Sequence, residues 1–477
     1  MKSLLRNLML FLASIFTSTF ILPLVILLVI FPLILYRKLI LSLASYKTDL
    51  YRHLNVSSSV FSWDDMYRRP TCSICLALYL KNKHDINQVI GRLESIVEKY
   101  PELSCTLHRW MGTIFWKKSP TFQLSRHLTI NEESDPEKIT HYLDTLPEKP
   151  YRKDAPLWEF VSLPNYENGT KSALILRLHH SLGDGLACIS VLSDFCDNKG
   201  GHTVLENIKG KFHKKKPPSW PRRFLNFLQL IFITPTEFAY LLLKGIDSNP
   251  LTIQVPDRSG EIVRCHNLVA LDMTDLKQIS ARTRTNVTSL MSAGIAGVMR
   301  EIMRKRGANR DATALYVLPN ISSHPGTLTN NIIVVPMRMP LLEASREERL
   351  LQISNQFRHF FNSTLLVGAA AVFSGNALVA SILKKEVVFP AAVTLVHSNI
   401  AIFEEDGCEF FGNPVERVLP IVGLLQTSCS LMITNLSYKG KMGISVTADK
   451  TLFSDKEELE GVINDITDEI NKLGQIK

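Results

Sequence analysis

An uncharged apolar segment near the N-terminus constrains this chain more than any other feature of its sequence. Leu8 to Tyr36 runs for 29 residues without a charged side chain, whereas about 20 residues suffice to cross a bilayer as a helix. A cleaved signal peptide is the alternative, but its apolar region is only about 7 to 15 residues long. The segment therefore predicts a membrane anchor over residues 1–45.

Two prolines and the flanking charges bear on the path of this anchor. Pro23 and Pro32 fit either a single tilted span with kinks or a re-entrant hairpin. More basic residues follow the segment (Arg37, Lys38, Lys47 and Arg52) than precede it (Lys2 and Arg6). By the positive-inside rule, this asymmetry favours a cytosolic location for the rest of the chain.

The length of 477 residues, with 45% hydrophobic and 21% charged residues, predicts two folded domains. We place the domains at 46–208 and 256–477, on either side of a linker over 209–255. Basic residues without any acidic neighbour fill the start of that linker: Lys209, Lys211, Lys214, Lys215, Lys216, Arg222 and Arg223. Three prolines indicate that the same stretch is stiff and non-helical: Pro217, Pro218 and Pro221.

Apolar residues follow the basic stretch at 224–233 and again at 238–243. Each run is short for crossing a bilayer but fits an interfacial helix, held to anionic lipids by the basic residues at about 1 kcal/mol each. A solvated crossover loop followed by a core helix explains the pattern equally well. Nucleic acid is not a predicted partner, because the basic run has no interleaved aromatic residues and no nucleic-acid-binding module is recognisable.

The eight cysteines are scattered, and the pair Cys72 and Cys75 has no second pair or histidine set to complete a zinc site. We therefore expect free thiols, a reducing compartment and no bound metal. Elsewhere the sequence alternates between strand and helix patterns in both halves, which predicts an α/β fold. The expected helices are 86–100, 186–197, 287–306 and 455–473.

A short apolar strand, predicted over 173–178, runs directly into His179-His180-Ser181-Leu182-Gly183-Asp184-Gly185. Successive strand side chains point to opposite faces, so His179 and His180 are unsuited to one metal ion and only one of them faces a given cavity. A neutral imidazole is a natural general base near neutral pH. Gly183 and Gly185 can adopt backbone angles closed to other residues, which lets Asp184 fold back and hold the imidazole or the loop.

The alternative interpretation is a pair of hydrogen-bonded core histidines followed by an ordinary turn. The pattern HHxxxDG arises by chance in only about one sequence in a thousand of this length and composition, so an active site is favoured.

HHxxxDG, preceded by Pro156-Leu157-Trp158-Glu159, resembles the wax ester synthase/diacylglycerol acyltransferase family of acyl-CoA-dependent O-acyltransferases. Its superfamily also contains chloramphenicol acetyltransferase and the condensation domains of peptide synthetases. Further similarity lies in residues 288–297, in Asn330-Asn331 followed by Pro336 and Pro340, in Ser398-Asn399-Ile400, and in 431–440 with Asp449. The resemblance covers residues 55 to 475.

The resemblance implies two chloramphenicol acetyltransferase-like domains, with mixed sheets flanked by helices and a tunnel between the domains. It also implies that His180 is the general base, with His179 supporting and Asp184 structural. Ser398 or Asn399 is implied as an oxyanion donor, although both also fit as turn residues at a strand end. Acyl-CoA is then a substrate, and no cofactor is expected.

The membrane anchor favours a lipid acceptor: diacylglycerol, giving triacylglycerol, or a long-chain alcohol, giving a wax ester. We expect residence in the endoplasmic reticulum or plasma membrane with the catalytic region cytosolic. The chain departs from the family at Thr288-Ser289, after Asn399, and at 318–322, where the usual nearby arginine is missing. A catalytically silent, membrane-tethered lipid-binding protein and an acyltransferase for a small polar alcohol or amine are the alternatives.

Overall fold

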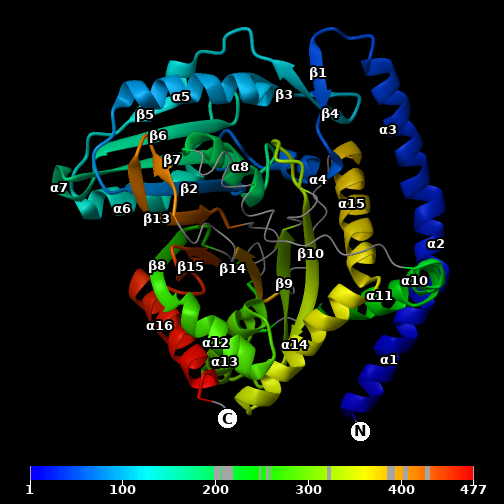
Figure 1. The fold of residues 1–477 in the computed structure, drawn as a ribbon. Helices are drawn as coiled ribbons and strands as arrows, with labels where there is room; N and C mark the ends of the chain where they lie inside the picture. Colours follow the sequence, from blue (N-terminus) through cyan, green and yellow to red (C-terminus); the bar gives the residue numbers. More distant parts are fainter. Residues whose placement is uncertain are drawn as a thin grey trace.

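Two six-stranded sheets carry most of the fold in the computed structural model, which describes residues 2–197, 206, 219–245, 249–253, 257, 259–319, 324–383, 393–400, 407–424 and 430–475. The first sheet has the order β12-β13-β2-β7-β6-β5 and the second the order β10-β9-β11-β14-β15-β8 (Figure 1). A three-stranded sheet, β1-β4-β3, flanks the first.

The strands of the first sheet are β2 (Ser73–Leu80), β5 (Leu128–Ile130), β6 (Trp158–Asn165), β7 (Lys171–His179), β12 (Glu409–Phe410) and β13 (Asn413–Val422). Those of the second are β8 (Ile262–Asp272), β9 (Ala312–Pro319), β10 (Ile332–Met339), β11 (Leu395–Ile400), β14 (Leu431–Tyr438) and β15 (Lys441–Asp449). The small sheet contains β1 (Leu50–His53), β3 (Cys105–Trp110) and β4 (Thr113–Lys118). Both large sheets are mixed, because β5 runs parallel to β6 and β11 runs parallel to β9 and β14.

Helices cover the sheets (Figure 1), and the four that the sequence predicts are confirmed to within two residues at each end: α5 (Ile86–Lys99), α8 (Gly185–Phe195), α13 (Val287–Lys305) and α16 (Lys456–Leu473). A polar residue caps each of the four by accepting a hydrogen bond from a backbone N–H of the first turn: Asp85, Asp184, Asn286 and Asp455. Three further helices pack in this part of the protein: α6 (Pro136–Thr145), α12 (Met273–Thr283) and α14 (Arg346–Asn362).

The first sheet takes two of its strands from the C-terminal half of the chain. Strand β13 pairs antiparallel with β2, from Val415 opposite Leu80 to Val422 opposite Ile74. The chain then returns to the second sheet at β14. The two halves therefore share a sheet, while the predicted boundary over 209–255 stays a prediction.

The basic linker lies outside the described residues up to Pro218. The expectation that Pro221 belongs to a non-helical stretch is wrong, because α10 (Trp220–Phe232) already includes it. Proline fits in a first helical turn, where its missing N–H costs no intrahelical hydrogen bond. Helix α11 (Thr234–Gly245) follows at a bend of 47°.

The N-terminal segment forms one continuous helix rather than a hairpin. It consists of α1 (Lys2–Phe16), α2 (Leu22–Val25) and α3 (Phe31–Ala44), joined by π-helical turns η1 (Thr17–Ile21) and η2 (Ile26–Ile30). Each π turn comes just before a proline, Pro23 or Pro32, where the wider turn accommodates the missing hydrogen bond. Residues 7–44 are long and apolar enough to cross a membrane.

A second helix long and apolar enough to cross a membrane, α15 (Leu365–Leu383), was not expected from the sequence. It packs against the short helices α4 (Val56–Ser59) and η3 (Val60–Trp63) on one side and lies beside the N-terminal helix on the other (Figure 1).

Candidate active site

The two histidines at the end of β7 point in different directions, as alternation along a strand requires. His179 is fully buried, and its Nε2 lies 3.1 Å from Oδ2 of Asp64. Its Nδ1 accepts a hydrogen bond from the backbone N–H of Ser181 at 3.2 Å. The ring proton therefore sits on Nε2 and is donated to Asp64. Burial lowers the pKa of His179, outweighing the opposing effect of Asp64, so this imidazole is a neutral structural group.

His180 instead lines a cavity between the two halves. Its backbone N–H donates to the carbonyl of Cys72 at 2.6 Å, and its carbonyl accepts from Nδ2 of Asn330 at 2.7 Å. The ring stacks on Phe61, with centroids 4.0 Å apart and planes 15° from parallel. Nδ1 has no hydrogen-bond partner among the described residues. The backbone is thus fixed on both sides while the ring keeps an unpaired nitrogen.

The surroundings of His180 keep its imidazole neutral. Burial lowers its pKa to about 4, although the negative charge of Asp184 opposes this shift. A desolvated neutral imidazole is ready to accept a proton at neutral pH. The ring can therefore serve as a general base.

Asp184 holds the loop rather than the imidazole. Its Oδ1 accepts from the backbone N–H groups of Leu186 and Ala187, at 2.9 and 3.0 Å, and so caps α8. Its Oδ2 accepts from the backbone N–H of Asn331 at 2.7 Å. Burial alone would raise the pKa of Asp184, but hydrogen bonds from His324 and the backbone keep it below its usual range. The structural role that the sequence favoured for Asp184 fits these contacts.

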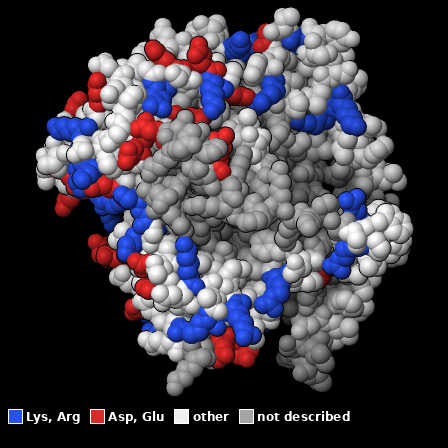
Figure 2. All heavy atoms as spheres, in the orientation of Figure 1, with Lys and Arg blue, Asp and Glu red and all other residues white. Residues whose placement is uncertain are grey.

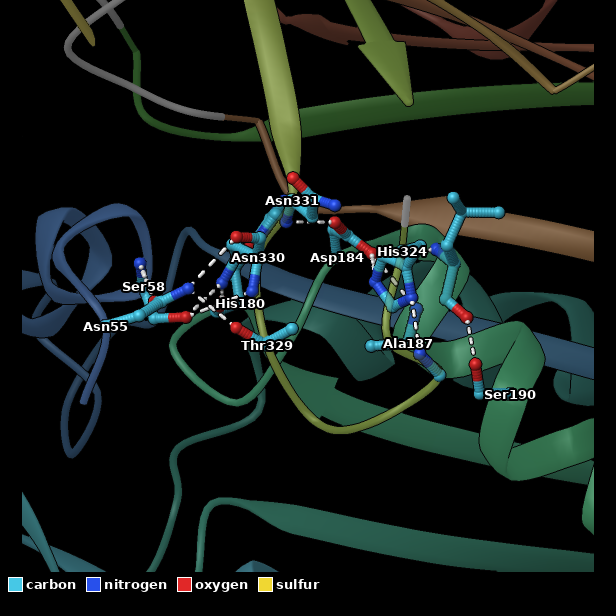
Figure 3. A network of polar contacts seen from close by, with 12 residues as sticks. Asn55, Ser58, His180, Asp184, Ala187, Ser190, His324, Thr329, Asn330 and Asn331 are labelled. Atoms are coloured by element: carbon cyan, nitrogen blue, oxygen red, sulfur yellow. Dashed lines mark hydrogen bonds and ion pairs between the residues drawn. The ribbon is translucent and has the colours of Figure 1, made fainter. Parts of the chain in front are cut away.

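Residues of the second half complete this network (Figure 3). His324 Nε2 lies 3.3 Å from Oδ1 of Asp184, and both side chains are buried. Asn330 donates through Nδ2 to Oγ of Ser58 at 2.8 Å as well as to His180. His324 and Ser58 were missed in the sequence, because each lies more than a hundred residues from the motif and neither belongs to a recognisable pattern.

The two glycines of the motif are explained by the lack of room for a side chain, and not by unusual backbone angles. Neither has a positive φ, so the expectation of angles closed to other residues is wrong. A Cβ on Gly183 would lie 2.4 Å from Cβ of Ala187, and one on Gly185 would lie 3.3 Å from Cδ1 of Ile400. Glycine is required at 183 because the loop passes too close to α8 for any side chain.

The cavity holds about 1500 Å³ of empty space, including the part open to solvent. Apolar side chains from both halves form most of its wall, among them Phe61, Ile74, Val334, Phe373 and Met432. A tunnel reached from two faces stays a prediction. The cavity suits an apolar substrate that comes within reach of His180.

Of the two predicted oxyanion donors, one lines this cavity. Ser398 does so from β11, whereas Asn399 points to the other side and donates through Nδ2 to Oγ1 of Thr288 at 3.1 Å. Thr434 on β14 also lines the cavity and lies opposite Ser398 in the parallel pairing. Thr434 was not among the predicted site residues, although its place in the resembling segment 431–440 was a signal for it.

The segment Pro156-Leu157-Trp158-Glu159 lies at the start of β6, next to the end of β7 that leads into the motif. The carbonyl of Leu157 accepts from the backbone N–H of His179 at 3.0 Å. Indole Nε1 of Trp158 donates to the carbonyl of Leu103 at 2.7 Å, and Glu159 pairs with the buried Arg177 at 3.4 Å. These residues fix β6 against β7 and do not reach the cavity.

Two family models match this chain. The wax ester synthase/diacylglycerol acyltransferase catalytic domain matches residues 77–239, and the WS/DGAT C-terminal domain matches residues 328–473. The first contains the histidine pair, and the second contains Asn330, Ser398 and Thr434.

Relatives and solved structures agree with these matches. A putative diacyglycerol O-acyltransferase of Mycobacterium tuberculosis is 21% identical over 425 residues, covering 80% of this chain and 82% of the relative. Wax ester synthase/diacylglycerol acyltransferase 11 of Arabidopsis thaliana is 24% identical over 450 residues, covering 81% and 89%.

Among solved structures, the wax ester synthase/diacylglycerol acyltransferase of Marinobacter aquaeolei VT8 superposes with a TM-score of 0.58 at 14% identity, covering 89% of this chain and all (100%) of the other. A trichothecene 15-O-acetyltransferase from Fusarium sporotrichioides gives 0.63 at 13% identity, covering 89% and 94%. These structures establish the chloramphenicol acetyltransferase-like α/β fold.

Proposed function

Because the chain belongs to the wax ester synthase/diacylglycerol acyltransferase family, we propose that it transfers a fatty acyl group from acyl-CoA to the hydroxyl of a membrane lipid. Diacylglycerol would yield triacylglycerol, and a long-chain alcohol would yield a wax ester. The observation that carries the proposal is the position of His180: a desolvated, neutral imidazole at the wall of an apolar cavity formed by both halves.

The reaction needs one base and no acyl-enzyme intermediate. His180 takes the proton of the acceptor hydroxyl, and the oxygen attacks the thioester carbonyl of acyl-CoA. The C–S bond then breaks, and the imidazolium returns its proton to the departing thiolate, giving coenzyme A. Holding both substrates in one cavity supplies much of the rate enhancement by orientation.

The oxyanion of the tetrahedral intermediate requires a hydrogen-bond donor. Ser398 and Thr434 are our candidates, because both line the cavity on adjacent strands. Asn399 is the weaker candidate, since its amide donates to Thr288. Asp184 and His179 are positioning residues, because they hold the loop and the strand end on which His180 sits.

Two features support a membrane-bound enzyme with a lipid acceptor. The N-terminal helix is long and apolar enough for a membrane, and the cavity wall is mostly apolar. We place the enzyme on the endoplasmic reticulum or plasma membrane with the cavity on the cytosolic side, where soluble acyl-CoA is available.

The test is an assay of microsomes containing the full chain with labelled acyl-CoA and a panel of acceptors, with products resolved by thin-layer chromatography. We expect labelled triacylglycerol, wax ester or both, and a loss of at least about 100-fold for His180→Ala. His141→Ala, which removes an exposed histidine on α6, is the matched control and should leave the rate unchanged.

The alternatives give different outcomes in this assay when acyl-CoA binding is measured beside it. Binding of acyl-CoA without transfer to any acceptor would indicate a catalytically silent lipid-binding protein. Transfer only to small polar alcohols or amines would overturn the lipid acceptor. Full activity of His180→Ala would remove His180 from its role as base.

A further inference from the structure

One side of the N-terminal helix faces the rest of the protein at intervals between Ser14 and Ala44, whereas residues 23–29 are exposed. The inward residues recur at helical spacing and include Ser14, Ser18, Ile30, Arg37, Ile40 and Ala44. At about 1.5 Å per residue, the interval from the first to the last of these spans about 45 Å. The part of the helix from Ser14 to Ala44 therefore lies beside the rest of the protein, next to α11 and α15 (Figure 1).

Polar contacts fix the helix at separate points. Oγ of Ser18 lies 2.6 Å from Oγ1 of Thr236 on α11. Nearer its other end, Nη2 of Arg37 donates to the carbonyl of Leu54 at 2.7 Å, and Tyr36 Oη donates to the carbonyl of Met111 at 3.1 Å. These points are about 29 Å apart along the helix, close to the thickness of the hydrocarbon core.

The parts of the protein beside these contacts carry solvated charges. Next to Thr236, Glu237 pairs with His359 at 2.7 Å, and both are at least one-third exposed. Just beyond α3, Asp49 pairs with Lys117 at 2.9 Å, and both are again exposed. An upright helix centred on its uncharged segment would carry the polar side chains of Glu237 and His359 into hydrocarbon, which is costly for polar groups that are exposed to solvent here. The docked position is incompatible with a simple crossing.

The opposite side of the helix is apolar and exposed. Its exposed side chains include Leu12, Phe16, Phe20, Leu28, Leu35 and Leu39. Helix α10, on the same flank, adds Trp220, Phe224, Leu225, Phe227 and Phe232. There is no acidic residue in 1–48 or in α10, whereas Lys38, Arg222 and Arg223 are exposed basic residues.

We propose that the N-terminal helix lies in the plane of the membrane, and that its outward side together with the exposed side of α10 forms one membrane face. The bilayer surface is the occupant that this chemistry fits, because wide apolar surface flanked by basic charge matches acyl chains below anionic headgroups. The sheet-bearing part carries interspersed acidic and basic side chains, as expected for a solvated surface (Figure 2). Both ends of the helix are then on the same side of the membrane.

The arrangement places the catalytic cavity one helix behind the membrane face. On α15, Phe373 lines the cavity, whereas a Cβ on Gly375 would lie 3.6 Å from Cδ1 of Ile30 in the N-terminal helix. Residues two apart on a helix point in nearly opposite directions. If the proposed function holds, a lipid acceptor in the membrane is one helix away from the cavity that His180 lines.

The topology is tested on the full chain in intact microsomes with a membrane-impermeant maleimide. Ser3→Cys marks the beginning of the helix, and Tyr46→Cys, at a position that is 85% exposed, marks its end. The unsubstituted chain gives the background from native cysteines. Equal labelling of the two positions, before and after detergent, supports the in-plane helix. Labelling of Tyr46→Cys alone until detergent is added would show a crossing and overturn the proposal.

The contribution of α10 is tested by fluorescence in vesicles of phosphatidylcholine and phosphatidylserine that carry bromine on their acyl chains. Trp220, which is 77% exposed, should contribute strongly to the quenched emission, so Trp220→Phe should lower the quenched fraction. An unchanged quenched fraction would remove α10 from the membrane face. Neither measurement depends on acyl transfer. Both therefore test the membrane face separately from the proposed function, which the activity assay tests.

Discussion

The carboxylate of Asp184 and the imidazole of His324 lie 3.3 Å apart across the junction of the two halves, and both side chains are buried. Asp184 belongs to the loop that carries His180, and His324 precedes β10 in the other half. The position of the catalytic loop therefore depends on how the N-terminal half of the chain packs against the C-terminal half.

Removing His324 should destabilise the protein. His324→Ala removes a buried polar side chain that lies 3.3 Å from the Asp184 carboxylate, and we expect the free energy of unfolding to fall by about 2 kcal/mol. His324→Gln keeps a polar N–H donor beside Asp184 and should lose less. Unfolding of both variants in detergent by heat or denaturant measures the difference. An alanine variant as stable as the unsubstituted chain would contradict a structural role for the pair.

The acid limb of the pH–rate profile should lie at a lower pH than it would for a histidine with an ordinary pKa. The pKa of His180 is about 4 because of burial, so the neutral, active imidazole persists as the pH falls from 7 to about 5. We expect kcat/KM to stay level over that range and to fall as the pH passes through about 4. A half-maximal rate near pH 6.5 would contradict the desolvated imidazole.

The free energy of unfolding should also fall as the pH falls, as the rate does. Burial also lowers the pKa of His397 to about 4, whereas both histidines titrate near 6.5 in the unfolded chain. Between these values the unfolded state binds more protons than the folded state, so the free energy of unfolding should fall as the pH drops below about 6.5. Thermal unfolding over this range is the control for the rate measurement.

Phe61 should control the pKa of the base. Its ring stacks on His180 with centroids 4.0 Å apart, so Phe61→Ala admits water to that side of the imidazole. We expect the acid limb of kcat/KM to move to higher pH and the rate at pH 7 to fall. Phe61→Leu, which keeps the site apolar, should shift the limb less. Identical acid limbs for the two variants would show that Phe61 does not set the pKa.

Gly183 should not tolerate alanine. A Cβ there would come within 2.4 Å of Cβ of Ala187, so Gly183→Ala must displace the loop or the start of α8. We expect lower stability and a rate loss greater than the fall in stability explains. Gly91→Ala is the matched control, because no atom lies within 4 Å of its Cβ position in α5. The control should stabilise the protein by about 0.5–1 kcal/mol.

Local patterns were sufficient to predict much of the fold. Alternation and apolar runs predicted the strand before His179 and the helices around Val89 and Ile295, because these elements bury a face with a regular period. The same reasoning separated the directions of His179 and His180. Helix α15 was missed even though residues 364–383 carry no charge, a signal as simple as the one that revealed the N-terminal helix.

Contacts between distant segments could not be predicted in this way. Asp64 binds His179 across 115 residues, and Asn330 binds the carbonyl of His180 across 150. Such pairs depend on how the halves dock, which one sequence does not encode in any local period. The space requirement at Gly183 is of the same kind, because the clash with Ala187 exists only once α8 is in place.

The place of β13 has a consequence for the newly synthesised chain. Strand β2, all of whose residues are buried, pairs with β7 on one side and with β13 on the other. Until the ribosome has made residue 422, one edge of this apolar strand has no neighbour. Unpaired strand edges attract other chains, and late closure favours misassembly. We therefore expect this edge to need shielding during translation, and truncated products that lack β13 to aggregate.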